Sequence, residues 1–135
     1  MSHALLNYDG LCRNIHGHSY KLQITVKGQP ANEPGSPKDG MVIDFSILKK
    51  IIQEKIISQL DHSLMINENA PTDKLNALGE MYERHQVVPF QPTSENLVVY
   101  IAEKVKPLLP EHIELFCVRL YETSNSFAEW YASDN

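Results

Sequence analysis

Two histidines separated by one glycine, His16-Gly17-His18, are the residues of this chain best placed to bind a metal ion. In a strand, residues i and i+2 project to the same face about 7 Å apart, because the rise is about 3.3 Å per residue. Two neutral imidazoles so placed can converge on one zinc ion, and a catalytic zinc site takes three protein ligands and keeps one position open. His3, which we expect in a loop, can supply the third ligand.

The same motif also has a plain structural interpretation, because most His-X-His pairs on strands bind no metal. Both histidines fall on the more apolar face of the predicted strand, where imidazoles without partners would be costly to bury. A metal ion would remove that cost. His3 taken alone could equally be an ordinary surface residue near a chain end, so the spacing leaves both interpretations open.

Cys12 lies four residues before His16 and is the candidate nucleophile or base. A free cysteine often serves only as a small buried apolar residue. Beside a metal ion or a protonated imidazole, however, its thiolate form is favoured and could act as a ligand or take a proton. The other cysteine, Cys117, lies among apolar residues of a predicted strand, and we assign it to packing.

Three further groups of polar residues could act on a substrate. In Asp61-His62 the carboxylate could orient the imidazole for proton transfer, although a histidine interacting with a helix dipole is the simpler reading. Glu122, at a strand end, is either solvated or an anchor that accepts two N–H bonds from a heterocycle. Thr93 and Ser94 open a helix, where they could bind a polar ligand or simply cap the helix.

Composition restricts the classes of protein to consider. The 135 residues fit one domain, 1–135, with 42% hydrophobic and 21% charged residues. The net charge of −5 argues against a nucleic-acid partner. There is no apolar stretch long enough to span a membrane and no secretory signal, so we expect a cytoplasmic protein with reduced thiols.

The elements that must position these residues follow from periodicity. Residues 16–27 alternate between polar and apolar side chains and predict one strand. A loop rich in Pro and Gly spans 28–40, and 41–43 is predicted as a short strand. Asp44 then caps a helix that runs to Leu60, with an apolar stripe at helical spacing that comprises Phe45, Leu48, Ile51, Ile52, Ile56 and Leu60.

The second half of the chain predicts two more helices and two strands. Residues 61–71 have no period, and a helix opens at 71–73 with Leu75, Leu78, Tyr82 and His85 on one side. Residues 87–91 break it, and a helix capped by Thr93 follows, with an apolar stripe of Leu97, Ile101, Val105 and Leu108. Strands are predicted at 112–122 and 127–132, joined by a turn. Strands paired in sequence with helices between them indicate an α+β fold with an antiparallel sheet.

Taken together, these segments resemble the 6-pyruvoyl-tetrahydropterin synthase / 6-carboxytetrahydropterin synthase family. The match runs from His3 to about Tyr131, and five short motifs occur in the family's order. They are Cys12-Arg-Asn-Ile-His16-Gly-His18-Ser-Tyr20, Gly40-Met-Val-Ile-Asp44-Phe45, Leu60-Asp61-His62, Pro92-Thr-Ser-Glu-Asn96 and Glu122-Thr123.

The resemblance implies a T-fold: an antiparallel sheet with helices on one face, closed into a barrel by oligomerisation. It implies a homohexamer, a dimer of trimers, with active sites at subunit interfaces. It carries zinc ligation onto His3, His16 and His18. It makes Cys12 the proton-abstracting thiol. The further roles it carries over are acid/base chemistry by Asp61 and His62, pterin anchoring by Glu122, and contacts with the pterin ring by Thr93 and Ser94.

The implied substrate is 7,8-dihydroneopterin triphosphate. One branch of the family eliminates triphosphate to give 6-pyruvoyl-tetrahydropterin for tetrahydrobiopterin. The other also releases acetaldehyde and leaves 6-carboxy-5,6,7,8-tetrahydropterin for queuosine. The step from Cys12 to His16 and the 40–45 motif resemble the second branch, which we prefer. The resemblance also implies Mg2+ assisting triphosphate loss. A non-catalytic pterin-binding T-fold assembly is a further alternative.

Two features depart from the family pattern. Members begin with a strand ahead of the first histidine, so the first strand of this chain is expected to be missing or truncated. Residues 63–91 are longer than the common pattern and are expected to add a helix. An insertion near a subunit interface could alter substrate choice, which bears on the product more than on the metal.

Overall fold

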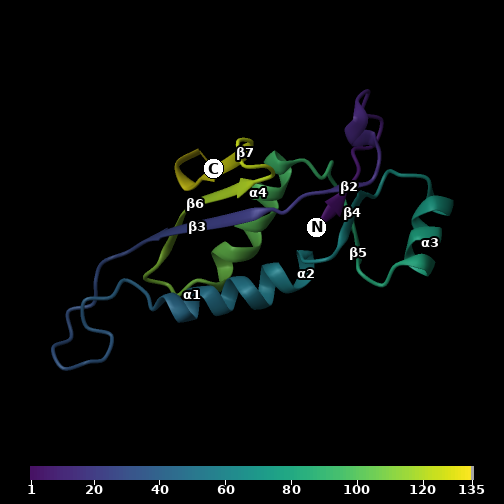
Figure 1. The fold of residues 1–135 in the computed structure, drawn as a ribbon. Helices are drawn as coiled ribbons and strands as arrows, with labels where there is room; N and C mark the ends of the chain where they lie inside the picture. Colours follow the sequence, from purple (N-terminus) through teal and green to yellow (C-terminus); the bar gives the residue numbers. More distant parts are fainter. Residues whose placement is uncertain (135) are drawn as a thin grey trace.

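A computed structural model describes residues 1–134 of the chain, and they form an α+β structure with two sheets. Three antiparallel strands cover helices α1 and α4, and a small four-stranded sheet lies at one end, with α3 beyond it (Figure 1). The strands are β1 Ser2–His3, β2 His16–Gly17, β3 Lys21–Lys27, β4 Leu64–Asn67, β5 His85–Val88, β6 Glu114–Tyr121 and β7 Phe127–Tyr131. The helices are α1 Phe45–Ile52, α2 Ser58–Leu60, α3 Thr72–Met81 and α4 Ser94–Val105. A π segment covers Gln53–Ile57, and 3-10 turns cover Leu11–Arg13, Lys106–Leu108 and Ala132–Asp134.

The larger sheet has the strand order β3-β6-β7 and is antiparallel throughout, as predicted. In β3 the side chains alternate between exposed and half-buried, because successive residues of a strand point to opposite faces. Opposite β3, the register slips between Thr25 and Val26, so Phe116 of β6 has no directly opposed residue. This bulge interrupts the alternation that the sequence predicts for 112–122.

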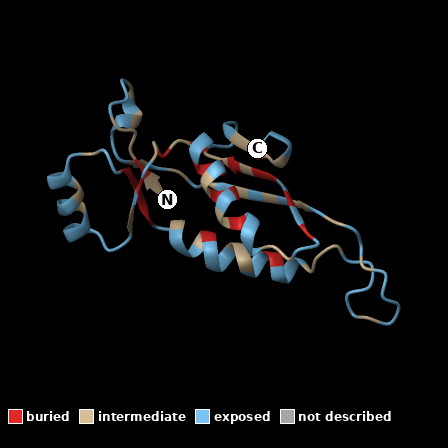
Figure 2. Ribbon diagram, turned by 180° about the vertical axis from the view of Figure 1, so that it is seen from behind, coloured by how far each residue is buried: buried red, intermediate tan, exposed pale blue. Residues whose placement is uncertain are grey.

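Helix α4 lies at the centre of the core. Thr93 caps it by accepting a hydrogen bond from the Asn96 amide at 3.4 Å, as predicted. The predicted stripe of Leu97, Ile101 and Val105 is buried against the sheet. Figure 2 shows buried residues concentrated on this helix and on the sheet facing it. The predicted stripe ends there, because Leu108 lies in the following 3-10 turn and is exposed.

The first predicted helix begins where the sequence places it but is not one continuous α-helix. Asp44 accepts hydrogen bonds from the amide and the hydroxyl of Ser46 at 2.8 and 2.7 Å. A π segment then separates α1 from α2 and rotates the helix face. Phe45, predicted on the buried stripe, is 81% exposed, because it stands in the first turn, beyond the sheet. The predicted strand at 41–43 is wrong, since these residues are irregular.

The smaller sheet corrects three other predictions. Its order is β2-β1-β4-β5, and β1·β4 and β4·β5 are parallel, so the prediction of a purely antiparallel sheet is wrong. All four residues of β4 are buried, so it shows no alternation, and 61–71 was predicted as irregular for that reason. His85 lies in β5 rather than on α3.

The predicted strand 16–27 is also divided between the two sheets. Its first residues form β2 in the smaller sheet and its later residues form β3 in the larger one, with an irregular stretch between them. His3, predicted in a loop, lies in β1. The helix expected within 63–91 is present as α3. Within residues 1–134 no helix is long and apolar enough to cross a bilayer.

Two adjacent valines of α4 test this placement of the core. Val98 is 2% exposed and Val99 is 39% exposed. We expect Val98→Ala to lower the free energy of unfolding by about 2 kcal/mol more than Val99→Ala, because only Val98 leaves a cavity. Both substitutions change helix propensity equally, so the difference isolates burial. Urea unfolding followed by circular dichroism measures it, and equal losses would contradict this packing.

Candidate metal centre and active site

Strand pairing brings the three predicted metal ligands together. In the antiparallel β1·β2 pair, His3 lies directly opposite His16, so both side chains project to one face. His18 follows two residues later on the same side. The ring centroids are 4.6 Å apart for His3 and His16, 5.0 Å for His16 and His18, and 5.4 Å for His3 and His18. One nitrogen from each ring lies within 4.8 Å of the others, so these three residues could hold a metal ion.

Backbone carbonyls fix the orientation of two of the rings. His3 Nδ1 lies 2.6 Å from the Pro92 carbonyl oxygen, and His16 Nδ1 lies 2.8 Å from that of Asn14. A carbonyl oxygen only accepts, so both Nδ1 atoms carry the hydrogen and both Nε2 atoms keep a free lone pair. This is the arrangement in which the second nitrogen of a metal-binding histidine is held by an outer partner.

Burial favours the neutral form of His3 that a metal requires. Desolvation lowers the pKa of His3, and the neighbouring His16 and His18 lower it further, against the opposing influence of the Pro92 carbonyl and the Glu122 carboxylate. A neutral imidazole is the species that coordinates metal ions. The deepest ring of the cluster is therefore already in its metal-binding form.

Glu122 and Tyr20 complete the cluster. Glu122 Oε1 lies 3.5 Å from His3 Nε2 and 3.6 Å from His18 Nε2, and it accepts a hydrogen bond from the Tyr20 hydroxyl at 3.2 Å. The same hydroxyl lies 3.4 Å from His3 Nε2. Burial, together with the charge of Glu122, raises the pKa of Tyr20 well above its ordinary value, so the phenol keeps its proton and donates it.

These atoms fit a bound cation. His18 Nε2 is buried and has no hydrogen-bond partner among the described residues. His3 Nε2 and the Glu122 carboxylate are both acceptors, and Tyr20 has one proton to share between them. A cluster of lone pairs with so few donors costs free energy to bury, and a divalent ion shared by the nitrogens would offset that cost.

Thr93 and Ser94 directly follow Pro92, whose carbonyl oxygen contacts His3 of the metal-ligand cluster, the group formed by His3, His16 and His18. The carbonyl that orients His3 belongs to the residue just before Thr93, and the preceding Gln91 ties the 4–15 loop down by bonds to the amide and carbonyl of Leu6 at 3.0 and 2.7 Å. The Ser94 hydroxyl oxygen is buried and has no hydrogen-bond partner among residues 1–134.

Cys12 lies in the 3-10 turn Leu11–Arg13, within the loop that joins β1 to β2. It is a free thiol of intermediate burial, and its carbonyl accepts a hydrogen bond from the Leu5 amide at 2.9 Å. Cys12 is the smallest of the influences that raise the pKa of Tyr20, so it lies near enough to affect the phenol. The half-buried position leaves it accessible to a substrate.

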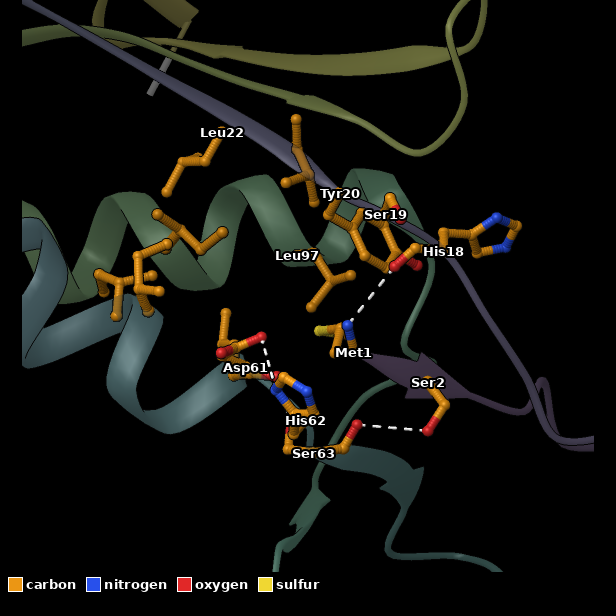
Figure 3. A pocket seen from close by; sticks show the side chains of 15 residues that line it. Met1, Ser2, His18, Ser19, Tyr20, Leu22, Asp61, His62, Ser63 and Leu97 are labelled. Atoms are coloured by element: carbon orange, nitrogen blue, oxygen red, sulfur yellow. Dashed lines mark hydrogen bonds and ion pairs between the residues drawn. The ribbon is translucent and has the colours of Figure 1, made fainter.

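Asp61 and His62 form a pair at the mouth of a neighbouring cavity. His62 Nδ1 lies 3.0 Å from Asp61 Oδ1, although adjacent residues rarely interact in this way; His62 has a left-handed backbone (φ 55°). Both line a cavity of about 590 Å3, with His18 and Tyr20 also in its wall. In Figure 3, Asp61 and His62 lie on one side of Met1, and His18 and Tyr20 lie on the other.

The structure therefore brings four of the nine predicted site residues together, namely His3, His16, His18 and Glu122. The ligand atoms of the three histidines lie within 4.8 Å of one another and Glu122 lies beside two of them, whereas Asp61 and His62 line a cavity that His18 and Tyr20 also line. The role of Tyr20 was not predicted, although Tyr20 lies on the same face of the predicted strand as His16 and His18. The contacts of His3 and His16 with the carbonyls of Pro92 and Asn14 were not predicted either, because backbone groups cannot be recognised from side-chain type.

Comparisons with known proteins identify the family of this chain. The family model described as 6-pyruvoyl tetrahydropterin synthase matches residues 1–133. A protein of Haemophilus influenzae named 6-carboxy-5,6,7,8-tetrahydropterin synthase is 34% identical, with 96% of this chain and 91% of the relative covered. A protein of the same name from Aquifex aeolicus is 33% identical over 88% of this chain and 75% of that relative.

Two solved structures have the same fold. An uncharacterized protein from Wolinella succinogenes gives a TM-score of 0.77 at 22% identity, covering 97% of this chain and 92% of that one. The 6-pyruvoyl tetrahydropterin synthase of Caenorhabditis elegans gives 0.65 at 24% identity, covering 97% and 87%. With the family model matched over nearly the whole length, the chain belongs to the 6-pyruvoyl tetrahydropterin synthase family.

Proposed function

We propose that this protein is a zinc-dependent lyase that converts 7,8-dihydroneopterin triphosphate to 6-carboxy-5,6,7,8-tetrahydropterin, with release of acetaldehyde and triphosphate. The observation that carries the proposal is the convergence of one ring nitrogen each from His3, His16 and His18, with the Nδ1 atoms of His3 and His16 held by backbone carbonyls. The names of the relatives from Haemophilus influenzae and Aquifex aeolicus support the choice of product.

In this proposal the three histidines hold a zinc ion, which supplies Lewis-acid polarisation of side-chain oxygens of the substrate. An imidazole set with an open position suits such a role. The Pro92 and Asn14 carbonyls keep the His3 and His16 rings from turning. The substrate rearranges its own reducing equivalents, so the protein needs no nicotinamide or flavin.

Proton transfer is assigned to two groups on different sides of the substrate. The thiolate of Cys12, in the β1–β2 loop, takes a carbon-bound proton from the side chain of the substrate. His62, held by the Asp61 carboxylate at 3.0 Å, delivers or removes the other proton. Both are open to solvent or cavity rather than sealed in the core, as a group that exchanges protons requires.

Recognition of the pterin ring is assigned to Glu122, at the end of β6, and to the start of α4. The Glu122 carboxylate can accept two N–H bonds from the amidine-like edge of the ring. Thr93 and Ser94 flank it at the start of α4, where the buried Ser94 hydroxyl has no partner among the described residues. These positions hold the ring while the side chain reaches the metal.

The assembly proposed for this chain is a hexameric T-fold barrel with active sites between subunits, in the cytoplasm. Within residues 1–134, β3 and β7 are the edge strands of the larger sheet. An exposed edge offers unpaired N–H and C=O groups, and pairing with the edges of other copies would satisfy them. Several large apolar residues are exposed on the described surface, which subunit contacts could cover; they include Leu11, Ile15 and Phe45.

Metal content gives a first test. We expect His16→Ala to reduce bound zinc from about one ion per chain to a small fraction of it, because two imidazoles hold zinc far more weakly than three. His112→Ala, which alters an exposed histidine outside the cluster, is the matched control and should keep its zinc. Elemental analysis after gel filtration measures both, and equal zinc in the two variants would rule out this metal site.

The reaction itself gives the second test. Incubated with 7,8-dihydroneopterin triphosphate, the zinc-loaded protein should release acetaldehyde and triphosphate in equal amounts. Chromatography and an aldehyde-trapping reagent measure the products. Triphosphate release with a 6-pyruvoyl product and no acetaldehyde would instead identify a 6-pyruvoyl-tetrahydropterin synthase. Absence of turnover would favour a pterin-binding protein without catalysis.

The third test concerns the thiol. We expect Cys12→Ala to lower kcat at least about 100-fold, because removing a positioned general base has that order of effect. Binding of a pterin and zinc content should be retained, since the thiol is not assigned to either. Cys117→Ala, in the core strand β6, serves as the control for loss of a thiol. Retention of full kcat in Cys12→Ala would remove Cys12 from the mechanism.

A further inference from the structure

The hairpin β6–β7 delivers Glu122 to the histidine cluster by strand register. Lys21 of β3 lies opposite Tyr121 of β6 at the end of this antiparallel ladder, and the residues just beyond that pair, Tyr20 and Glu122, meet through a hydrogen bond of 3.2 Å. The Glu122 amide donates to the Ser126 carbonyl at 2.9 Å and closes the turn. The carboxylate is therefore brought to the metal-ligand residues by backbone pairing and not by a chance side-chain conformation.

The distances from this carboxylate to the imidazoles resemble the edges of a coordination tetrahedron. Four ligand atoms placed about 2.0–2.2 Å from a zinc ion at tetrahedral corners lie about 3.3–3.6 Å apart. Glu122 Oε1 lies 3.5 Å from His3 Nε2 and 3.6 Å from His18 Nε2. Neither distance is a hydrogen bond, and both match the spacing of two ligands that share one ion.

The surroundings of Glu122 suit a ligand that can also leave the metal. Tyr20 donates to the same Oε1 at 3.2 Å, and such an outer hydrogen bond orients a coordinating carboxylate. The Glu122 side chain is 27% exposed, whereas that of His3 is 2% exposed. The imidazole is fixed in the interior, but the carboxylate has room to turn toward a ligand that enters from solvent.

We propose that Glu122 is a fourth protein ligand of the metal when no pterin is bound, and that it leaves the metal when it binds the pterin ring. The second claim, that Glu122 leaves the metal to bind pterin, rests on the proposed function. The first half rests only on the cluster. The metal is then closed by four protein ligands at rest, and binding of the correct ring opens the position that the substrate side chain uses.

Zinc affinity in the absence of pterin tests the first half. Metal-free protein is titrated with Zn2+ against a chromophoric chelator. We expect Glu122→Gln to raise the dissociation constant for zinc at least about 10-fold. Glu114→Gln, which alters an exposed carboxylate paired with Lys27, should leave it unchanged. Equal affinity in Glu122→Gln and the unaltered protein would overturn the proposal.

The visible spectrum of the Co2+-substituted protein separates ligation from simple charge attraction. We expect the unaltered protein and Glu122→Gln to differ in their d–d bands, because a carboxylate ligand is exchanged for water or an amide. Weaker affinity with an unchanged spectrum would mean that Glu122 acts through its charge alone, which would also overturn the proposal.

Pterin without a side chain tests the second half, since it cannot bring hydroxyl groups to the metal. Its addition to the Co2+ protein should shift the spectrum toward that of Glu122→Gln, and no shift at saturating pterin would contradict the exchange. This arm uses the unaltered protein, so it holds even if the variant folds poorly. No arm measures turnover, so an inactive protein would refute the proposed function without deciding the metal ligation.

Discussion

The site depends on holding several hydrogen-bond acceptors, the ring nitrogens of His3 and His18 and the Glu122 carboxylate, close together in a partly buried position. His3 is buried, and its Nε2 faces a carboxylate oxygen 3.5 Å away, while His18 Nε2 has no hydrogen-bond partner among the described residues. Such a cluster is unfavourable by itself, because each buried acceptor has given up its hydrogen bonds to water. The surrounding structure must hold the groups together until a cation compensates them.

Backbone groups do most of this holding. Pairing of β1 with β2 sets His3 opposite His16, and the carbonyls of Pro92 and Asn14 fix which nitrogen of each ring points inward. The start of α4 therefore serves the metal-ligand cluster as well as the core, since the residues that follow Pro92 cap the helix and those after them pack beneath the sheet. A shift of α4 would turn the His3 ring.

The sequence predicted the chemically active side chains better than it predicted the course of the backbone. The family was predicted from five motifs and is confirmed, and the three histidines that the resemblance names as metal ligands lie close enough together to hold an ion. Strand β4 was missed, because a fully buried strand such as Leu64–Asn67 lacks the alternation that marks a half-buried one. Strand β5 was missed because its first residue, His85, was assigned to the preceding helix. The oxygen partners of His3 and His16 were missed because a carbonyl belongs to every residue type.

Register also limits what a sequence can reveal about Tyr20 and Glu122. Glu122 was predicted at a strand end and Tyr20 within the strand 16–27, and only the pairing of Lys21 with Tyr121 and the hydrogen bond beyond it show that they meet. The roles assigned to Asp61, His62 and Cys12 stay predictions. An Asp61–His62 pair was one of the two interpretations that the sequence left open, but the left-handed backbone at His62 was not expected, since it is uncommon for a residue with a side chain.

The span of the metal-ligand cluster along the chain has a consequence for how the protein is made. His3 is held by a carbonyl 89 residues away, and Tyr20 bonds a carboxylate 102 residues away. Contacts of such long range form late, since a large loop must close before they stabilise anything. On a ribosome, the first histidines emerge long before the C-terminal hairpin, so metal capture by the complete set must await release of nearly the whole polypeptide.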